Sequence, residues 1–135
     1  LERIRLPLEA GVPVIVAHLG AAVRFRRDPD QTPLMRTLLR SYPHLWLDNS
    51  GMANPARSGA LARGARDAEL AERTLHGSDF PVPCSAAWFV RRMGVRAAAR
   101  VEGIRNPLAR DLALKAALGW DDAPVLRGAR VLRLP

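Results

Sequence analysis

The chain has 135 residues, a formal net charge of +8, 48% hydrophobic residues and 25% charged residues. These values fit a single globular domain at most and exclude an intrinsically disordered chain. No apolar run approaches the roughly 18 residues that a membrane span needs, and no signal peptide is visible, so we expect no membrane partner.

The chain begins, without a methionine, inside the amphipathic segment LERIRLPLEAG, and this favours a piece of a longer protein. Three short apolar runs follow. VPVIVAHLG at 12–20, HLWLDNSG at 44–51 and TLHGSD at 74–79 each predict a strand. The first run is rich in β-branched residues and bounded by glycines, which is typical of a strand buried on both faces in a parallel sheet.

Helical patterns separate the three predicted strands. LMRTLLRSY, residues 34–42, has apolar residues at helical spacing, with Thr32 as the expected N-cap and Pro33 at the first helical position. The segment 53–73 has a weaker pattern that glycines interrupt, and Asp67 is its expected cap. The order strand, helix, strand, helix, strand predicts an α/β fold with parallel strands and right-handed crossovers.

Two further helices are predicted after the third strand. SAAWFVRRMG begins at the cap Ser85 and ends at Gly94, with an apolar face of Trp88, Phe89 and Met93. NPLARDLALKAALG begins at the cap Asn106 and ends at Gly119, with an apolar stripe of Leu108, Leu112 and Ala116. The tail from residue 121 can add one more short helix.

Each predicted strand ends in polar residues: His18 in the first, Asp48, Asn49 and Ser50 in the second, Ser78 and Asp79 in the third. Ligands of parallel α/β folds bind beyond the carboxyl ends of the strands, so this pattern favours an active site there. Helix capping is the alternative explanation. It accounts for Asp48 or Ser50 but poorly for His18, because histidine is not a favoured cap.

His18 and Asp79 are therefore candidate catalytic residues and metal ligands. Histidine and aspartate are common zinc ligands, and a zinc-bound water needs a neighbouring base. Two residues alone do not make a catalytic zinc site, which takes three protein ligands. The sequence has no H-E-x-x-H, no paired cysteines and no H-x-H that would supply more.

The other reactive side chains are interpreted as structural. Alternation along the strands, continued to their ends, points Val14, Val16 and His18 to one side and turns His76 toward the outer helices. His44 is interpreted as a strand-entry residue. The single Cys84 is interpreted as a packing residue; it cannot form an internal disulfide, so we expect a cytoplasmic location.

Four stretches in this order, PVIVAHLG, YPHLWLDNSG, LHGSDFP and NPLARDLALKAALG, resemble the C-terminal part of the amidohydrolase superfamily. The closest likeness is to its branch of TIM-barrel metal-dependent hydrolases and decarboxylases, over residues 8–120. G-S-D-F-P after an apolar strand is the most specific element. The resemblance implies that residues 1–135 form one partial domain, the C-terminal portion of a (β/α)8 TIM barrel: strands six to eight with flanking helices and C-terminal helices.

The resemblance also implies roles for the two candidate residues. Asp79 matches the eighth-strand aspartate, which binds the metal or hydrogen-bonds its water and shuttles the proton. His18 matches the sixth-strand histidine, which ligates a metal or acts on substrate and water. The implied cofactor is a divalent metal, with zinc as first choice. The implied reaction on a small-molecule substrate is attack of metal-activated water on an amide, lactone or ester carbonyl, or in some relatives a decarboxylation.

The chain lacks metal-ligand motifs that the resemblance would lead us to expect. The H-x-H of the first strand and the ligand of the fifth have no counterpart in the sequence. Three strands cannot close a barrel. We therefore expect the complete protein to be an enzyme and these 135 residues alone to be inactive. Substrate-binding residues are not identified.

Two other functions stay open. A half-barrel with open strand edges can serve as a non-catalytic interaction module, and self-association into a homo-oligomer stays open with it. The basic net charge suggests nucleic-acid binding as a third function. Against it, the arginines are dispersed without interleaved aromatic residues, and Lys115 is the only lysine. Arg24, Arg26 and Arg27 follow the first strand, where they can contact an anionic substrate or simply form a solvated loop.

Overall fold

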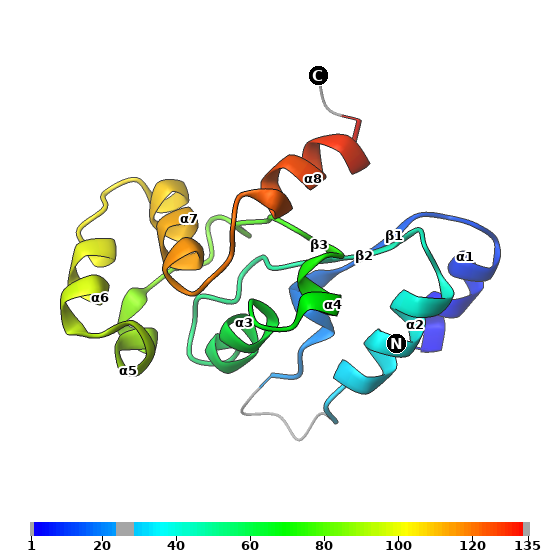
Figure 1. Cartoon of the computed structure of the whole chain (residues 1–135), viewed down its shortest axis with the longest axis horizontal. Coiled ribbons are helices and arrows are strands. Elements are labelled where there is room, and N and C mark those ends of the chain that lie inside the picture. Colours follow the sequence, from blue (N-terminus) through cyan, green and yellow to red (C-terminus); the bar gives the residue numbers. More distant parts are fainter. Residues whose placement is uncertain (1, 24–28, 134–135) are drawn as a thin grey trace.

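The structure is a computed structural model that describes residues 2–23 and 29–133 (Figure 1). Its centre is a parallel sheet with the strand order β1-β2-β3. The strands are β1 (Val14–Val16), β2 (Leu45–Asp48) and β3 (Thr74–Leu75). Val14 lies opposite Leu45, and Leu47 lies opposite Thr74. The predicted α/β class with parallel strands is confirmed.

The helices follow the strands in the predicted alternation. The first part of the chain contains a 3₁₀ turn η1 (Glu2–Ile4), α1 (Arg5–Glu9), a second turn η2 (Ala17–Gly20), α2 (Thr32–Ser41), α3 (Ser58–Gly64) and α4 (Ala68–Ala71). The remainder contains η3 (Ala86–Phe89), α5 (Val90–Met93), α6 (Val95–Glu102), α7 (Pro107–Ala117) and α8 (Ala123–Val131). Within the described ranges, no helix has the length and apolar character to cross a bilayer.

The observed strands are shorter than the predicted ones. The first ends at Val16 because His18 and Leu19 have φ values of 58° and 57°, which no strand accommodates. The third ends at Leu75, four residues before Asp79. Alternation therefore stops before both candidate residues, and the predicted common side of Val14, Val16 and His18 does not hold.

Helix starts agree with the predicted caps in three of four cases. Asp67 accepts a hydrogen bond from the Leu70 amide, Ser85 from Ala87, and Asn106 from Leu108 and Ala109. At α2 the prediction is wrong, because Thr32 is the first helical residue rather than the cap. Asp30 Oδ1 accepts hydrogen bonds from the Thr32 amide at 3.0 Å and from Thr32 Oγ1 at 2.7 Å, so Asp30 supplies the oxygen that Thr32 was expected to supply.

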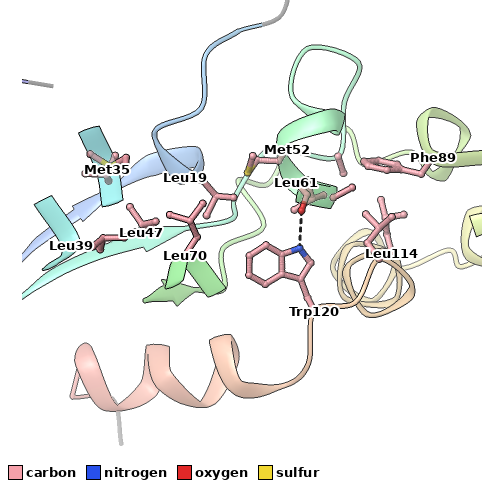
Figure 2. Packing of buried hydrophobic residues seen from close by; sticks show 14 of the residues in the cluster. Leu19, Met35, Leu39, Leu47, Met52, Leu61, Leu70, Phe89, Leu114 and Trp120 are labelled. Carbon is pink, nitrogen blue, oxygen red and sulfur yellow. Dashed lines mark hydrogen bonds between the residues drawn. The ribbon is translucent and has the colours of Figure 1, made fainter. Parts of the chain in front are cut away.

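One hydrophobic core joins the sheet to its helices (Figure 2). Leu47 of β2 packs in this cluster with Met35 and Leu39 of α2, while Leu61, Phe89 and Leu114 extend it toward the later helices. Trp120 Nε1 donates to the carbonyl oxygen of Leu61 at 3.2 Å, which gives the buried indole its polar partner. On the opposite face of the sheet, Ile15 is 42% exposed.

The predicted apolar faces of two helices are wrong in part. Phe89 is buried, but Trp88 is 55% exposed. In α7, Leu108 and Leu112 are 49% and 44% exposed, whereas Asp111 and Lys115 are buried. The helix turns this charged pair inward because the two side chains bond to each other at 2.6 Å, so neither charge is buried alone.

Helix α8 closes the outer edge of β3 (Figure 1). The His76 amide donates to the carbonyl oxygen of Pro124 at 3.1 Å. Arg127 Nη1 donates to the carbonyl oxygens of Ala71, at 2.9 Å, and Thr74. Edge strands leave unpaired backbone groups, and these bonds satisfy two of them without a further strand.

Candidate active site

The candidate site begins where β1 ends. His18 has a φ of 58°, and a non-glycine residue in this left-handed region needs support from its surroundings. The support comes from β2, since the His18 amide donates to Asp48 Oδ1 at 3.0 Å. The strained turn is therefore held by the neighbouring strand end.

Asp48 organises the turn after β2. Its Oδ1 also accepts hydrogen bonds from the Ser50 amide at 2.9 Å and from Ser50 Oγ at 2.5 Å. Three donors on one carboxylate oxygen leave Asp48 as a structural group. The capping explanation for Asp48 and Ser50 thus has the right chemistry, a carboxylate that accepts backbone amides, but in a turn instead of at a helix start.

The His18 ring is oriented by Ser50. Its Nδ1–H donates to the carbonyl oxygen of Ser50 at 2.8 Å, and Ser50 Oγ lies 3.2 Å from the same nitrogen. A carbonyl oxygen only accepts, so the proton is on Nδ1. In the neutral ring this leaves the Nε2 lone pair available to a metal or to a proton, which is how ligating histidines are commonly held.

Asp79 reaches the same turn from β3. It has a φ of 58° and its side chain is exposed. The next residue after Ser50 is Gly51, with a φ of 52°, and a Cβ placed there would lie 2.2 Å from Asp79 Oδ2. Only a glycine leaves room for the carboxylate at this position. His18 and Asp79 therefore both lie against the Ser50–Gly51 turn, although 60 intervening residues separate them in sequence.

The donor set fits a metal ion in part. His18 presents a free Nε2 and Asp79 presents an exposed carboxylate, both suitable for Zn²⁺. Among residues 2–23 and 29–133, no group of three His, Cys, Asp or Glu side chains is placed to hold an ion. These two residues supply two ligands of a set that needs at least one more.

A second polar cluster lies behind the site, and sequence reasoning missed it. Lys115 Nζ donates to Asp111 Oδ2 at 2.6 Å and to the carbonyl oxygen of Gly77 at 2.7 Å. His76 Nε2 lies 3.7 Å from the same carboxylate oxygen. The available signal was the only lysine in the chain, four residues after an aspartate, since an i, i+4 pair lies on one face of a helix.

Burial shifts the pKa values in this cluster. Burial, then the Lys115 charge, lowers the pKa of His76 to about 4. Burial, then the Asp111 charge, raises the pKa of the Cys84 thiol to about 11. Cys84 is thus a protonated thiol, in agreement with its interpretation as a packing residue.

The comparison with known families decides the assignment. A family model described as Amidohydrolase matches residues 7–123. The chain belongs to the amidohydrolase family. No curated protein and no solved structure matches it significantly. The matched range contains β1 to β3, the Ser50–Gly51 turn and both candidate residues, and the family points to hydrolase-type activity.

The remaining predicted residues have these positions. His44 enters β2 and its Nε2 donates to the carbonyl oxygen of Leu8 at 2.9 Å, which is a structural role. His76 faces Asp111 of α7, as expected for a residue turned toward the outer helices. Arg24, Arg26 and Arg27 lie outside the described residues. The catalytic roles of His18 and Asp79 stay predictions.

Proposed function

We propose that this amidohydrolase chain is the C-terminal part of a TIM barrel, comprising strands six to eight, and that the complete enzyme hydrolyses an amide, lactone or ester. The observation that supports this most is the convergence of His18 and Asp79 on the Ser50–Gly51 turn. Residues 1–135 would form one partial domain, because the sheet has three strands whereas a closed barrel has eight.

Asp79 is the proposed general base. Its carboxylate is exposed, and within the described residues no hydrogen bond engages it. It can therefore accept the proton of the attacking water and return it to the leaving group. The contact with Gly51 fixes where the carboxylate lies.

His18 is the proposed ligand or polarising group. The Ser50 carbonyl holds the Nδ1 proton, so Nε2 is directed to the substrate side as a lone pair. A divalent metal, zinc as first choice, would be held by His18 and Asp79 with further ligands, and would supply a water of lowered pKa and stabilise charge on the carbonyl oxygen. The decarboxylation known in related enzymes would use the same residues.

The test uses the longest reading frame that contains this chain. The purified product is assayed for metal content and for turnover of amides, lactones and esters. His18→Ala and Asp79→Asn are each expected to reduce turnover by about 100-fold or more and to lower the bound metal. Asp122→Asn, an exposed position without a side-chain cap bond, is the matched control and should retain both. Unchanged turnover in the first two variants would refute the proposal.

A further inference from the structure

A cavity opens at the same end of the sheet as the candidate site. It has a volume of about 680 Å³ and is lined by segments that follow all three strands. Ala21 and Ala22 come after β1, Arg57 and α3 come after β2, and Trp88 with α5 comes after β3. Figure 1 shows α3 and α5 at the end of the sheet toward which β2 runs. Because the strands are parallel, their carboxyl ends meet there.

The charge of this cavity is strongly unbalanced. Four arginines line it: Arg57, Arg63, Arg91 and Arg92. Asp30 is the carboxylate among its lining residues, and both donors of Thr32 already occupy its Oδ1. Within residues 2–23 and 29–133, no ion pair involves any of the four guanidinium groups. By contrast, Arg36 and Arg40 of α2 are paired with Asp67 and Glu69.

One of these arginines has a buried donor without an acceptor. Arg57 Nε is shielded from solvent and makes no hydrogen bond within the described residues. An unsatisfied buried donor destabilises a protein, and more so when it is charged. This shielded Nε is out of reach of a ligand, but the remainder of the Arg57 guanidinium group lines the cavity, and guanidinium groups bind carboxylate and phosphate oxygens in a planar, paired geometry.

Trp88 supplies an apolar wall next to the charges. Its side chain lines the cavity and is 55% exposed, although the sequence pattern predicts it in the core. An indole that faces a cavity can pack against the carbon skeleton of a ligand whose anionic end contacts arginine. The lining therefore suits a small organic anion better than an isolated inorganic ion.

We propose that this arginine cavity, formed by Arg57, Arg63, Arg91, Arg92 and Trp88, binds an anionic group of the substrate at a distance from the bond that is cleaved. The inference rests on the proposed function for its link to catalysis, and it narrows the substrate class to carboxylates and phosphates. Four guanidinium groups against one carboxylate favour a ligand group with two negative charges, either two carboxylates or one phosphate.

The test measures binding, without turnover, to the product of the longest reading frame that contains this chain. Glutarate and inorganic phosphate are titrated by calorimetry at fixed ionic strength, with glutaramide as the uncharged match. We expect one saturable site for at least one of the anions and none for the diamide. Tighter binding of glutarate assigns a dicarboxylate, and tighter binding of phosphate assigns a phosphoryl group. Absence of saturable binding for both anions overturns the inference.

Matched variants distinguish anion binding in the cavity from nonspecific attraction to the positive net charge of the chain. Arg91→Gln/Arg92→Gln should weaken anion binding by about tenfold or more. Arg100→Gln/Arg130→Gln removes the same charge from the last turns of α6 and α8, outside the cavity, and should leave the affinity unchanged. Equal weakening by both pairs means diffuse attraction and overturns the inference. The Arg57 Nε–H resonance of the unaltered chain gives a second readout, because it should shift on anion binding whether or not the variants fold.

The binding assay also keeps this inference separate from the proposed function. His18→Ala and Asp79→Asn should leave anion binding unchanged, because neither residue lines the cavity. If the complete protein proves inactive while the cavity still binds anions, the proposed function fails and the binding site stands. If the enzyme is active but accepts neutral and anionic substrates equally, the anion site fails and the hydrolase assignment stands.

Discussion

Lys115 Nζ lies 2.6 Å from Asp111 Oδ2 and 2.7 Å from the carbonyl oxygen of Gly77. Lys115 is 2% exposed and Asp111 is 3% exposed, so the pair is buried at the contact between α7 and the end of β3. Gly77 is two residues before Asp79. The only lysine of the chain therefore ties helix α7 to the segment that positions the proposed general base.

Lys115→Met should destabilise the chain by about 3–5 kcal/mol, because it leaves the Asp111 carboxylate buried without its partner. The double variant Lys115→Met/Asp111→Leu removes both charges and should recover most of this loss. Urea denaturation followed by circular dichroism measures both free energies of unfolding. If the double variant is no more stable than the single one, the loss comes from packing rather than from the unpaired charge.

Stability should fall in mild acid because of His76. Its pKa in the folded chain is about 4, below the ordinary value of 6.5, so the unfolded chain binds the proton more readily between these values. The stability that the neutral ring contributes is present above pH 6.5 and is lost as the pH falls toward 4. For a partly solvated ring we expect a loss of about 1–2 kcal/mol. Unfolding free energies at pH 7 and 4.5 should differ less in His76→Gln than in the unaltered chain.

The strands and helices of the fold could be predicted from local sequence patterns, but the face that each helix buries could not always be predicted. The three strands and their parallel order follow from apolar runs that alternate with helices, and the caps Asp67, Ser85 and Asn106 follow from helix-start chemistry. The i, i+4 spacing of Asp111 and Lys115 indicates that the two side chains pair, but hydropathy assigns the pair to the surface, so the inward face of α7 could not be predicted. What buries them is the bond to Gly77, 38 positions away in sequence.

His18 and Asp79 were selected as candidates from the sequence, but the contacts that position them could not be predicted, and their catalytic roles stay predictions. His18 and Asp79 follow from the rule that polar strand ends meet in a parallel sheet. The carbonyl of Ser50 that orients His18 cannot be read from a side-chain pattern, since every residue has one. The arginine cavity was missed for a related reason: Arg57 and Arg91 meet only after α3 and α5 are placed.

Gly51→Ala should displace the Asp79 carboxylate, because the added Cβ would lie 2.2 Å from Oδ2. The positive φ adds a backbone cost, and we expect a total destabilisation of about 1–2 kcal/mol. Gly11→Ala is the control, with a φ of 76° and nothing within 4 Å of the added Cβ. In the complete enzyme, Gly51→Ala should reduce turnover by about tenfold or more, and Gly11→Ala should not. Equal turnover in the two variants would mean that the position of Asp79 does not matter.

Arg127→Ala should open the outer edge of β3, because Arg127 donates to the carbonyl oxygens of Ala71 and Thr74. We expect a destabilisation of about 1–3 kcal/mol and faster aggregation on mild heating. Arg130→Ala removes the same charge from the exposed side of α8 and serves as the control. Light scattering measures the rates, and equal rates would show that α8 does not protect this edge.

The two edges of the sheet differ in a way that limits how copies of the chain can associate. Within the described residues β1 pairs with β2 alone, whereas the outer side of β3 carries the bonds from α8. An open filament needs two different complementary edges on each subunit, whereas a single type of edge can only pair with itself across a twofold axis. If this three-stranded sheet pairs with a second copy outside a complete barrel, association through the β1 edge alone would stop at a closed dimer, and loss of the Arg127 contacts would add a second kind of edge from which an assembly can grow.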